Sequence, residues 1–595
     1  MGPRLRGDGK ENCHMNLGAR FLSLTVALFL TTSALAQSQP QLASTLPNIP
    51  PVSGILAHNG MVVAQESRAA RIGVEILDRG GNAVDAAVAV GFAMAVTYPR
   101  AGNLGGGGFM VIHLADGRDT SVDYRETAPA AATKDMFLDA QGNPDPKKSR
   151  DSGLAVGVPG TVAGLALAAR KYGSGRLSLA DLIAPAIDLA QNGFPVEDDL
   201  ADSLPGARER LKRWHSSQSI FFNGDQVLQE GDRLLQFDLA DTLRAIAQEG
   251  PRGFYEGHVA EDIARAVRGA GGVMTADDLK NYRAIERPVV RGTYRGYDVV
   301  SMPPPSSGGV ALIEMLNILE GYDLAKLGRG DEALHFMIEA MRRAYADRAA
   351  YMGDPDRVKM PIAGLISKKY AVSLRASIGP RATPSADVRP GKPAEFEGRN
   401  TTHFSVIDRD GNAVSNTYTL NCSYGLGLVA DGTGVLLNNE LDDFTAKPGA
   451  ANAYGLIGYD ANLPAPGKRP LSSMTPTIVL KDGKPFLITG SPGGSRIITA
   501  VLQVISNAID FHMPIDRAVG APRLHEQWQP DEVYVEPGFD PAVLEALKAR
   551  GHTIVPTQPR TSANSIAVVP KGELTPQTYV GAADPRTRGA TAAGY

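Results

Sequence analysis

The five residues 408–412, read as a turn between two runs of β-type residues, constrain this chain more than any other local feature. Asp408 at the first turn position and Gly411 at the fourth favour a type I turn closed by a glycine bulge. In that three-residue loop Asp408 pairs with Asn412. The segment 401–420 is therefore predicted to form an antiparallel hairpin.

The predicted register places two hydroxyl side chains near the open end of this hairpin. A three-residue loop places Thr401 opposite Thr419, whereas a two-residue loop would place Thr419 opposite Thr402. Facing residues have Cβ atoms about 5 Å apart, so two hydroxyls can interact there. Spacing alone favours a simple cross-strand pair of threonines. A catalytic role is favoured by position, because a segment rich in Pro and Gly, 377–400, which we expect to be exposed and extended, runs directly into the first strand.

Helical and strand patterns alternate along the rest of the chain, without an internal repeat, which predicts an α/β or α+β enzyme-sized fold. The expected helices are 68–77, 83–96, 162–171, 332–351 and 501–509. The expected strands are 108–114, 403–407, 414–420, 477–480, 486–489 and 565–569.

An apolar run at 21–30 follows Arg20 and precedes the small residues of 34–36. This order is typical of a secretory signal, and the run is shorter than the roughly 20 residues that span a bilayer. We therefore expect 1–36 to be a signal peptide and the product to be exported, periplasmic or secreted. The longest later candidate, 83–96, contains Asp85, so no membrane span is expected after signal removal.

Charge and cysteine content exclude several classes of protein. Lys plus Arg number 60 and Asp plus Glu 64, so the chain has no excess of positive charge for binding nucleic acid. Cys13 lies in the expected signal and leaves Cys422 alone, which excludes a disulfide framework. No zinc motif is present, and His335 with Glu339 on one helix face is interpreted as a surface contact. We expect no metal and no cofactor.

Four ordered motifs then resemble one enzyme family, γ-glutamyltransferase, also called glutathione hydrolase. The motifs are TTHFSV at 401–406, NNELDDF at 438–444, RPLSSM at 469–474 and TGSPGGSR at 489–496. The resemblance extends upstream through 105–109 and 123–126 and downstream to 592–595. It implies an α+β, four-layer αββα sandwich of the N-terminal-nucleophile hydrolase type.

The resemblance further implies a precursor, or zymogen, that cleaves itself between Asn400 and Thr401. The products would be a large subunit, 37–400, and a small subunit, 401–595, which together form one fold as a heterodimer. The freed α-amine of Thr401 has a reference pKa near 7.7 to 8 and can act as the base for its own hydroxyl. Thr419 would support this nucleophile.

The remaining site residues also follow from the resemblance. Gly493 and Gly494 would supply the backbone N–H groups of an oxyanion hole. A γ-glutamyl group carries an α-carboxylate and an α-ammonium, so its site needs opposite charges in two places. The carboxylate would be bound by Arg125, Ser472 and Ser473, and the ammonium by Asn421, Glu440 and Asp443. Tyr454 would belong to a lid at 448–460.

The implied function is cleavage of glutathione and other γ-glutamyl compounds through an ester on Thr401. Water, amino acids or peptides would accept the γ-glutamyl group. Two alternatives stay open: a cephalosporin or glutaryl amidase of the same superfamily, and a non-catalytic exported binding protein. Asp443 weighs against the amidase, which would not need to bind an α-ammonium.

Overall fold

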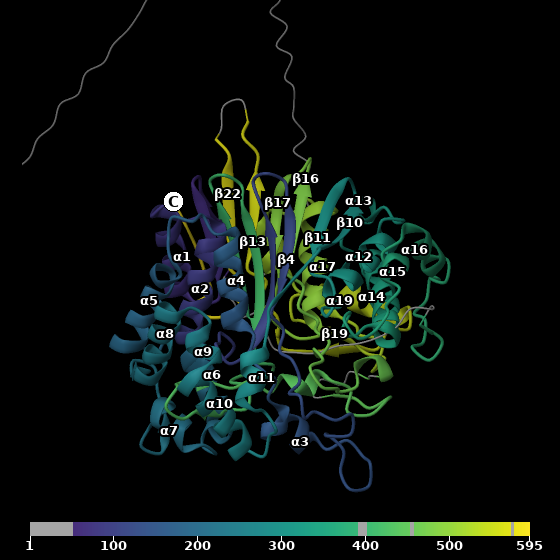
Figure 1. The fold of residues 1–595 in the computed structure, drawn as a ribbon. Coiled ribbons are helices and arrows are strands. Elements are labelled where there is room, and N and C mark those ends of the chain that lie inside the picture. The colour runs from purple at the N-terminus through teal and green to yellow at the C-terminus, as the bar shows by residue number, and fades with distance from the viewer. Residues whose placement is uncertain (1–50, 391–401, 453–456, 458, 573–575) are drawn as a thin grey trace, which may run out of the picture. The chain divides into compact units, whose positions relative to one another are not determined.

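Two β-sheets lie between two layers of helices in the computed structural model (Figure 1). The structure describes residues 51–390, 402–452, 457, 459–572 and 576–595. The expected signal peptide, 1–36, lies outside the described residues. The described residues belong to one compact unit, Ser44–Tyr595.

The first sheet, called the hairpin sheet, is built around the hairpin expected from the sequence. Its strands come from both sides of position 400, and every pair of neighbours is antiparallel. In spatial order, the strands described are β23 (Thr591–Gly594), β2 (Gly60–Ala64), β12 (Thr402–Asp408), β13 (Ala413–Thr419), β3 (Gly107–His113), β4 (Asp119–Asp123) and β9 (Ile285–Arg287).

The second sheet is also antiparallel and packs on one face of the hairpin sheet. Its described strands, in spatial order, are β1 (Ile55–Ala57), β22 (Thr578–Ala582), β21 (Ser565–Val569), β17 (Lys484–Thr489), β16 (Thr477–Lys481), β11 (Tyr297–Ser301) and β10 (Val290–Tyr294).

The two faces of the hairpin sheet serve two different cores because side chains alternate along a strand. Val62, Val406 and Val414 lie side by side in the register and pack into the core beneath the first helical layer. Their neighbours Met61 and Ile407 point to the opposite face and pack in the core shared with the second sheet. Both faces are buried, so β2 is apolar throughout, whereas β12 and β13 also carry buried polar side chains.

The first helical layer covers the hairpin sheet, with α2 against the strands (Figure 1). Every residue of α2 is buried, which explains why its sequence is apolar apart from Asp85 and Thr97. Asp85 forms a capping box with Asn82 at the start of the helix. The helices that contribute to this core are α1 (Ser67–Asp78), α2 (Ala83–Thr97), α4 (Thr161–Tyr172), α5 (Leu179–Asn192), α6 (Asp198–Leu211), α7 (His215–Phe221), α8 (Phe237–Glu249), α9 (Arg252–Tyr255), α10 (Gly257–Gly269) and α11 (Ala276–Asn281).

The second helical layer covers the second sheet on the other side of the sandwich (Figure 1). Its helices are α12 (Gly308–Leu319), α13 (Leu324–Leu327), α14 (Asp331–Tyr351), α15 (Ile362–Leu365), α16 (Lys368–Arg375), α17 (Arg496–Ile509), α18 (Ile515–Gly520) and α19 (Pro541–Ala549). This is the α+β, four-layer αββα sandwich that the resemblance implies.

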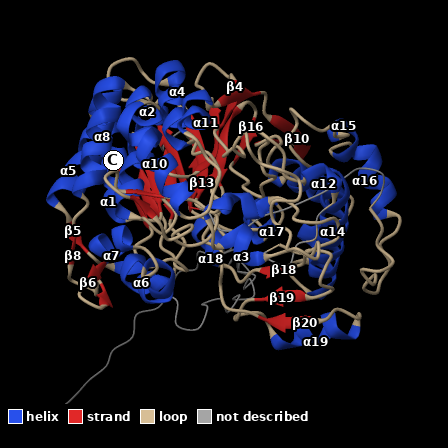
Figure 2. Cartoon of the chain, turned by 60° about the horizontal axis from the view of Figure 1, so that its bottom comes forward, coloured by secondary structure: helices blue, strands red, loops and turns tan. Residues whose placement is uncertain are grey.

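Short elements complete the fold, including a small sheet beside α19 (Figure 2). The sheet contains β18 (Leu524–His525), β19 (Val533–Val535) and β20 (Ile554–Pro556); other described pairs are β5 (Phe194–Pro195) with β8 (Arg233–Leu234), β6 (Phe222–Asn223) with β7 (Gln226–Val227), and β14 (Val429–Ala430) with β15 (Val435–Leu436). The short helices are α3 (Pro146–Arg150), η1 (Gly153–Ala155), η2 (Glu440–Asp443) and η3 (Asp460–Asn462).

The helices and strands expected from the sequence are all present, and their boundaries differ by at most two residues, except that α17 begins at Arg496, five residues before the expected start. The expected exposure of the segment 377–400 holds for most of its described part, 377–390, with two exceptions. Ser385 and Val388 are buried there, and the indole Nε1 of Trp528 donates to both of their carbonyls at 3.0 Å. Side chains distant in sequence therefore anchor a segment that composition alone marks as solvent-exposed. In the part of the chain that the structure describes, no helix is both long and apolar enough to cross a membrane.

Candidate active site

The hairpin β12–β13 has the three-residue register predicted from its turn. Thr402 pairs with Tyr418 and His403 with Thr417, and the Asp408 backbone N–H donates to the Asn412 carbonyl at 3.1 Å. Gly411 has a φ of 92°, the left-handed conformation that the glycine bulge requires. The carboxylate of Asp408 also accepts from the backbone N–H of Asn412 at 3.0 Å, which locks the loop. Asn400 and Thr401 lie outside the described residues.

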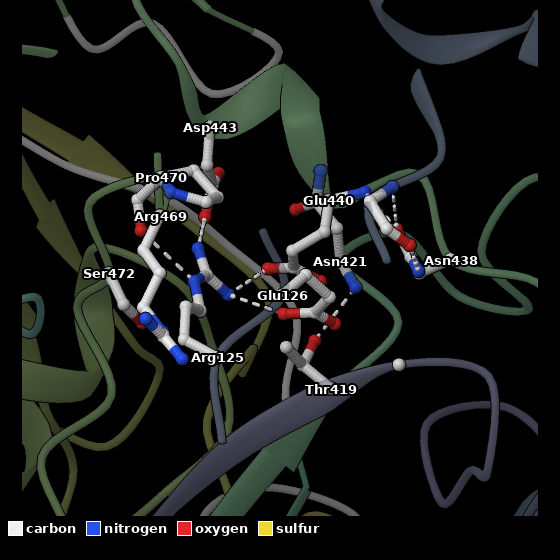
Figure 3. Close-up of polar contacts among 12 residues, drawn as sticks. Arg125, Glu126, Thr419, Asn421, Asn438, Glu440, Asp443, Arg469, Pro470 and Ser472 are labelled. Carbon is white, nitrogen blue, oxygen red and sulfur yellow. Dashed lines mark hydrogen bonds and ion pairs between the residues drawn. The ribbon is translucent and has the colours of Figure 1, made fainter. Parts of the chain in front are cut away.

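Thr419 ends β13 and is held from two directions. Its hydroxyl oxygen accepts from the backbone N–H of Asn421 at 2.8 Å (Figure 3). Its carbonyl accepts from Asn103 Nδ2 at 2.8 Å. A Cβ at Gly106 would lie 2.1 Å from that carbonyl, so only glycine allows the backbone to approach here. Thr419 is consequently fixed beside the open end of the hairpin.

The segment that follows β13 is bonded to η2. Asn421 Nδ2 donates to the Asn439 carbonyl at 2.9 Å, and the Asn439 N–H donates to the Leu420 carbonyl at 3.1 Å. Asn438 Oδ1 accepts from the N–H of Glu440 at 3.0 Å, which orients the first turn of η2. These bonds bring Asn421 and Thr419 near the acidic side chains of η2, as Figure 3 shows.

Arg125, two residues after β4, lies at the centre of a buried charged cluster (Figure 3). Its guanidinium donates to the carboxylates of Glu440 and Asp443, and its Nε donates to the Pro470 carbonyl at 3.1 Å. The sequence suggested two separate groups, one cationic and one anionic, whereas the structure joins them in direct ion pairs. An unpaired buried charge is costly, so the guanidinium and the carboxylates compensate each other.

Glu126 is a member of this cluster to which sequence reasoning gave no role. Its carboxylate lies 3.7 Å from Arg125 Nη1, and its side chain is fully buried. Burial raises the pKa of Glu126 to about 8 and that of Glu440 to about 8, and it also raises the pKa of Asp443. Its position directly after Arg125 in the 123–126 motif was the available signal. Burial therefore opposes ionisation of these three carboxyl groups, and the charge of the Arg125 guanidinium counteracts it.

Ser472 and Ser473 lie on the loop next to Arg125, since Arg125 Nη2 also donates to the Leu471 carbonyl at 3.1 Å. The Ser473 hydroxyl oxygen accepts from Arg348 Nη2 at 2.6 Å, a contact with α14 that the sequence did not indicate. The Ser472 carbonyl accepts from the Ser307 hydroxyl at 2.7 Å. Both serines are buried, and the loop that carries them is fixed by α12 and α14.

Gly493 and Gly494 lie between β17 and the first turn of α17. Their φ angles are 127° and 65°, a region that other residues rarely occupy. Their carbonyls accept from Arg496 and Ile497, so their N–H groups lie at the helix start, where anions are favoured. The same loop begins at Gly490, whose added Cβ would lie 2.5 Å from the His403 ring of β12. The loop that carries the glycine pair therefore packs against His403, near the start of β12.

The expected lid residue, Tyr454, lies outside the described residues. The interpretation of His335 and Glu339 as a surface contact is wrong, because both are fully buried. His335 Nδ1 lies 2.8 Å from His552 Nε2, and Glu339 accepts from Arg343 at 2.6 Å. The three side chains could reach a common metal ion, but Glu339 is already paired with Arg343 and both ring nitrogens of His335 have hydrogen-bond partners.

Comparisons with known proteins agree with this architecture. A family profile described as Gamma-glutamyltranspeptidase matches residues 69–594. The "Glutathione hydrolase proenzyme" of Escherichia coli (strain K12) is 52% identical over 565 residues, which cover 93% of this chain and 96% of the relative.

Among solved structures, a cephalosporin acylase from Bacillus halodurans has a TM-score of 0.82 at 29% identity and covers 94% of this chain and 99% of its own. A γ-glutamyltranspeptidase from Helicobacter pylori has a TM-score of 0.53 at 51% identity, with 55% of this chain and 93% of its own covered. The fold is that of the N-terminal-nucleophile hydrolases. The chain belongs to the gamma-glutamyltranspeptidase family and is an enzyme.

Proposed function

We propose that this protein is an exported, self-processing γ-glutamyltransferase and glutathione hydrolase, active as a heterodimer of 37–400 and 401–595. The observation that supports the assignment most directly is the buried cluster of Arg125 with Glu440 and Asp443, close to the open end of the hairpin β12–β13. It offers one cation and an excess of carboxyl groups, the charges that a zwitterionic γ-glutamyl head needs.

Processing is the first chemical step. The Thr401 hydroxyl attacks the Asn400 carbonyl, the C–N bond breaks, and the acyl group moves to oxygen as an ester. Water then hydrolyses this ester, which leaves a carboxylate on Asn400 and a free α-amine on Thr401. The amine has a reference pKa of about 7.7 to 8, so part of it is neutral near pH 7 and can accept the hydroxyl proton.

Binding of a γ-glutamyl compound exchanges one set of ion pairs for another. The α-carboxylate of the substrate forms an ion pair with the Arg125 guanidinium and accepts hydrogen bonds from the hydroxyls of Ser472 and Ser473. The α-ammonium forms ion pairs with the carboxylates of Glu440 and Asp443, which no longer contact Arg125. Each buried charge keeps a partner throughout, which limits the desolvation cost of the exchange.

Acyl transfer follows the same logic as processing. The Thr401 hydroxyl attacks the γ-carbonyl, and the N–H groups of Gly493 and Gly494 stabilise the oxyanion. The amine leaves with the proton taken from the hydroxyl, and the γ-glutamyl ester remains on Thr401. Water releases glutamate, whereas an amino acid or peptide amine forms a new γ-glutamyl amide. Thr419 positions the nucleophile from the facing strand.

The amidase alternative is tested by two substrates that differ only in the α-ammonium. γ-Glutamyl p-nitroanilide carries this group and glutaryl p-nitroanilide lacks it. We expect kcat/KM to be at least about 30-fold higher for the γ-glutamyl compound, since loss of a buried charge partner costs roughly 2 to 5 kcal/mol. Equal or reversed values of kcat/KM would assign the chain to the amidases, a class represented among the similar structures by the cephalosporin acylase from Bacillus halodurans.

The same assay addresses the second alternative, a binding protein without catalysis. Thr401→Ala is the matched variant, since it removes the hydroxyl together with the γ-methyl group and keeps every described residue. Turnover by the natural chain and none by Thr401→Ala supports the enzyme. Binding of glutamate without turnover by the natural chain would favour a binding protein.

A further inference from the structure

A cavity of about 620 Å³ opens on the first helical layer, outside the cluster around Arg125. It lies between α4, the start of α5, α9 and the residues after α11. Its wall includes Tyr255 and Tyr282, whose rings stack at 5.8 Å between centroids with an interplanar angle of 10°. Leu167 and Leu177 extend the apolar lining. The volume is in the range of cavities that hold small molecules.

The rim of this cavity is positively charged. Arg170, Arg252, Lys280 and Arg283 line it and are exposed, and Glu256 is the acidic residue in the lining. Arg252 lies 3.9 Å from Glu256, so three cations stay in excess. The chain as a whole has a net charge of −4, so this concentration of positive charge is local. An apolar interior below a cationic rim is complementary to a small molecule with a hydrocarbon body and one carboxylate.

Two hydrogen bonds connect the cavity wall with the candidate active site. The Tyr282 hydroxyl donates to the Arg125 carbonyl at 2.8 Å. Arg469 Nη2, from the RPLSSM motif, donates to the Arg283 carbonyl at 2.8 Å. A molecule that presses on the Tyr282 ring therefore acts on the backbone that carries the Arg125 guanidinium.

We propose that this cavity is a second ligand site that binds a small amphipathic carboxylate and thereby adjusts Arg125. The apolar body lies against Tyr255 and Tyr282, and the carboxylate is held at the rim by Lys280 and Arg170. The effect on Arg125 rests on the proposed function, whereas binding in the cavity does not.

Binding is tested by titration calorimetry with octanoate and with 1-octanol, which share a chain length but differ in charge. We expect saturable binding of one octanoate per molecule, and at least about tenfold weaker binding of octanol. Lys280→Gln with Arg170→Gln on the exposed rim should weaken octanoate at least tenfold, and Leu167→Trp should abolish binding by filling the cavity. Lys369→Gln, an exposed residue of α16, is the control and should bind as the natural chain does.

No saturable octanoate binding, or equal binding of octanoate and octanol, would overturn the proposal. So would unchanged affinity in the rim variant, which alters only exposed side chains and does not depend on repacking around Leu167→Trp.

The connection with Arg125 is tested by Tyr282→Phe, which keeps the ring and removes the hydroxyl. We expect octanoate to change the KM for γ-glutamyl p-nitroanilide at least twofold in the natural chain and not in Tyr282→Phe, although both bind octanoate. The same KM change in both proteins would contradict the connection and indicate direct competition at Arg125. Absence of turnover would count against the proposed function alone, because calorimetry decides the binding separately.

Discussion

The guanidinium of Arg125 donates to the carboxylate of Asp443, and the two side chains are only 0% and 2% exposed. The residues are 318 positions apart and lie on opposite sides of the proposed cleavage bond. After processing, this buried ion pair would join the two subunits at the substrate site. Its carboxylate is also the group that we assign to the substrate ammonium.

Asp443→Asn should lower kcat/KM for γ-glutamyl p-nitroanilide by about 10²- to 10³-fold, because an amide cannot balance a buried ammonium or guanidinium. The loss should be smaller for glutaryl p-nitroanilide, which lacks the ammonium. Steady-state kinetics with both substrates measures this difference. Asp442→Asn is the control, because Asp442 pairs with Arg150 at 3.1 Å instead. Equal losses for the two substrates would show that Asp443 has only a structural role.

Glu440 should make the folded protein less stable as the pH rises. Burial raises its pKa to about 8, so the folded chain keeps a proton that the unfolded chain releases above its ordinary value of 4.5. The free energy of unfolding therefore falls between about pH 4.5 and pH 8. In Glu440→Gln this contribution is absent, and the fall in Tm from pH 5 to pH 8 should be smaller by about 1 to 3 °C. Parallel Tm curves for the two proteins would contradict the assignment.

Gly493→Ala should reduce turnover by about 10²- to 10³-fold, the usual loss for one oxyanion donor. The added Cβ would lie 2.6 Å from Thr561, so the loop must shift and its N–H group would be displaced. Gly483→Ala imposes a similar left-handed strain at a φ of 74°, with open space around its Cβ. That control should lose stability but keep its kcat. Comparable kcat values for both variants would argue against an oxyanion role.

The buried pair of His335 and His552 should weaken the fold in acid. Burial lowers the pKa of His552 to about 4, so below pH 6.5 this histidine binds a proton in the unfolded chain but not in the folded chain. The free energy of unfolding is therefore highest above pH 6.5 and falls as the pH decreases towards 4. His552→Gln should show a smaller loss of Tm over that range, whereas His258→Gln, at an exposed position of α10, should follow the natural protein.

Added zinc and added EDTA should both leave the Tm of the natural protein unchanged. Glu339 already accepts from Arg343 and from the Thr383 hydroxyl at 2.7 Å, so the cluster has little charge left for a metal ion. A rise of several degrees with zinc would identify the cluster as a metal site.

Local signals predicted the hairpin most accurately. Asp408, Gly411 and Asn412 determine the turn within five residues, and the turn determines the register of both strands. The capping box at Asn82 likewise marks the start of α2 to the residue. Turns and helix caps depend on a few adjacent residues, so they can be predicted from a single amino-acid sequence.

Contacts between distant segments could not be predicted from the residues alone. His335 lies on a helix with many charged residues, and its burial depends on His552, 217 positions away. The pairing of Arg125 with Glu440 likewise joins residues 315 positions apart. The family resemblance selected these residues as one site, but it did not indicate that the two binding groups contact each other or that Glu126 joins them.

The central claim is that cleavage at one bond creates the catalyst, and intact-mass spectrometry of the purified mature protein tests it most directly. The account predicts two chains whose masses correspond to 37–400 and 401–595, with Thr401 at the new N-terminus, and a single uncleaved chain for Thr401→Ala. A single chain in the natural protein that still turns over γ-glutamyl p-nitroanilide would contradict it.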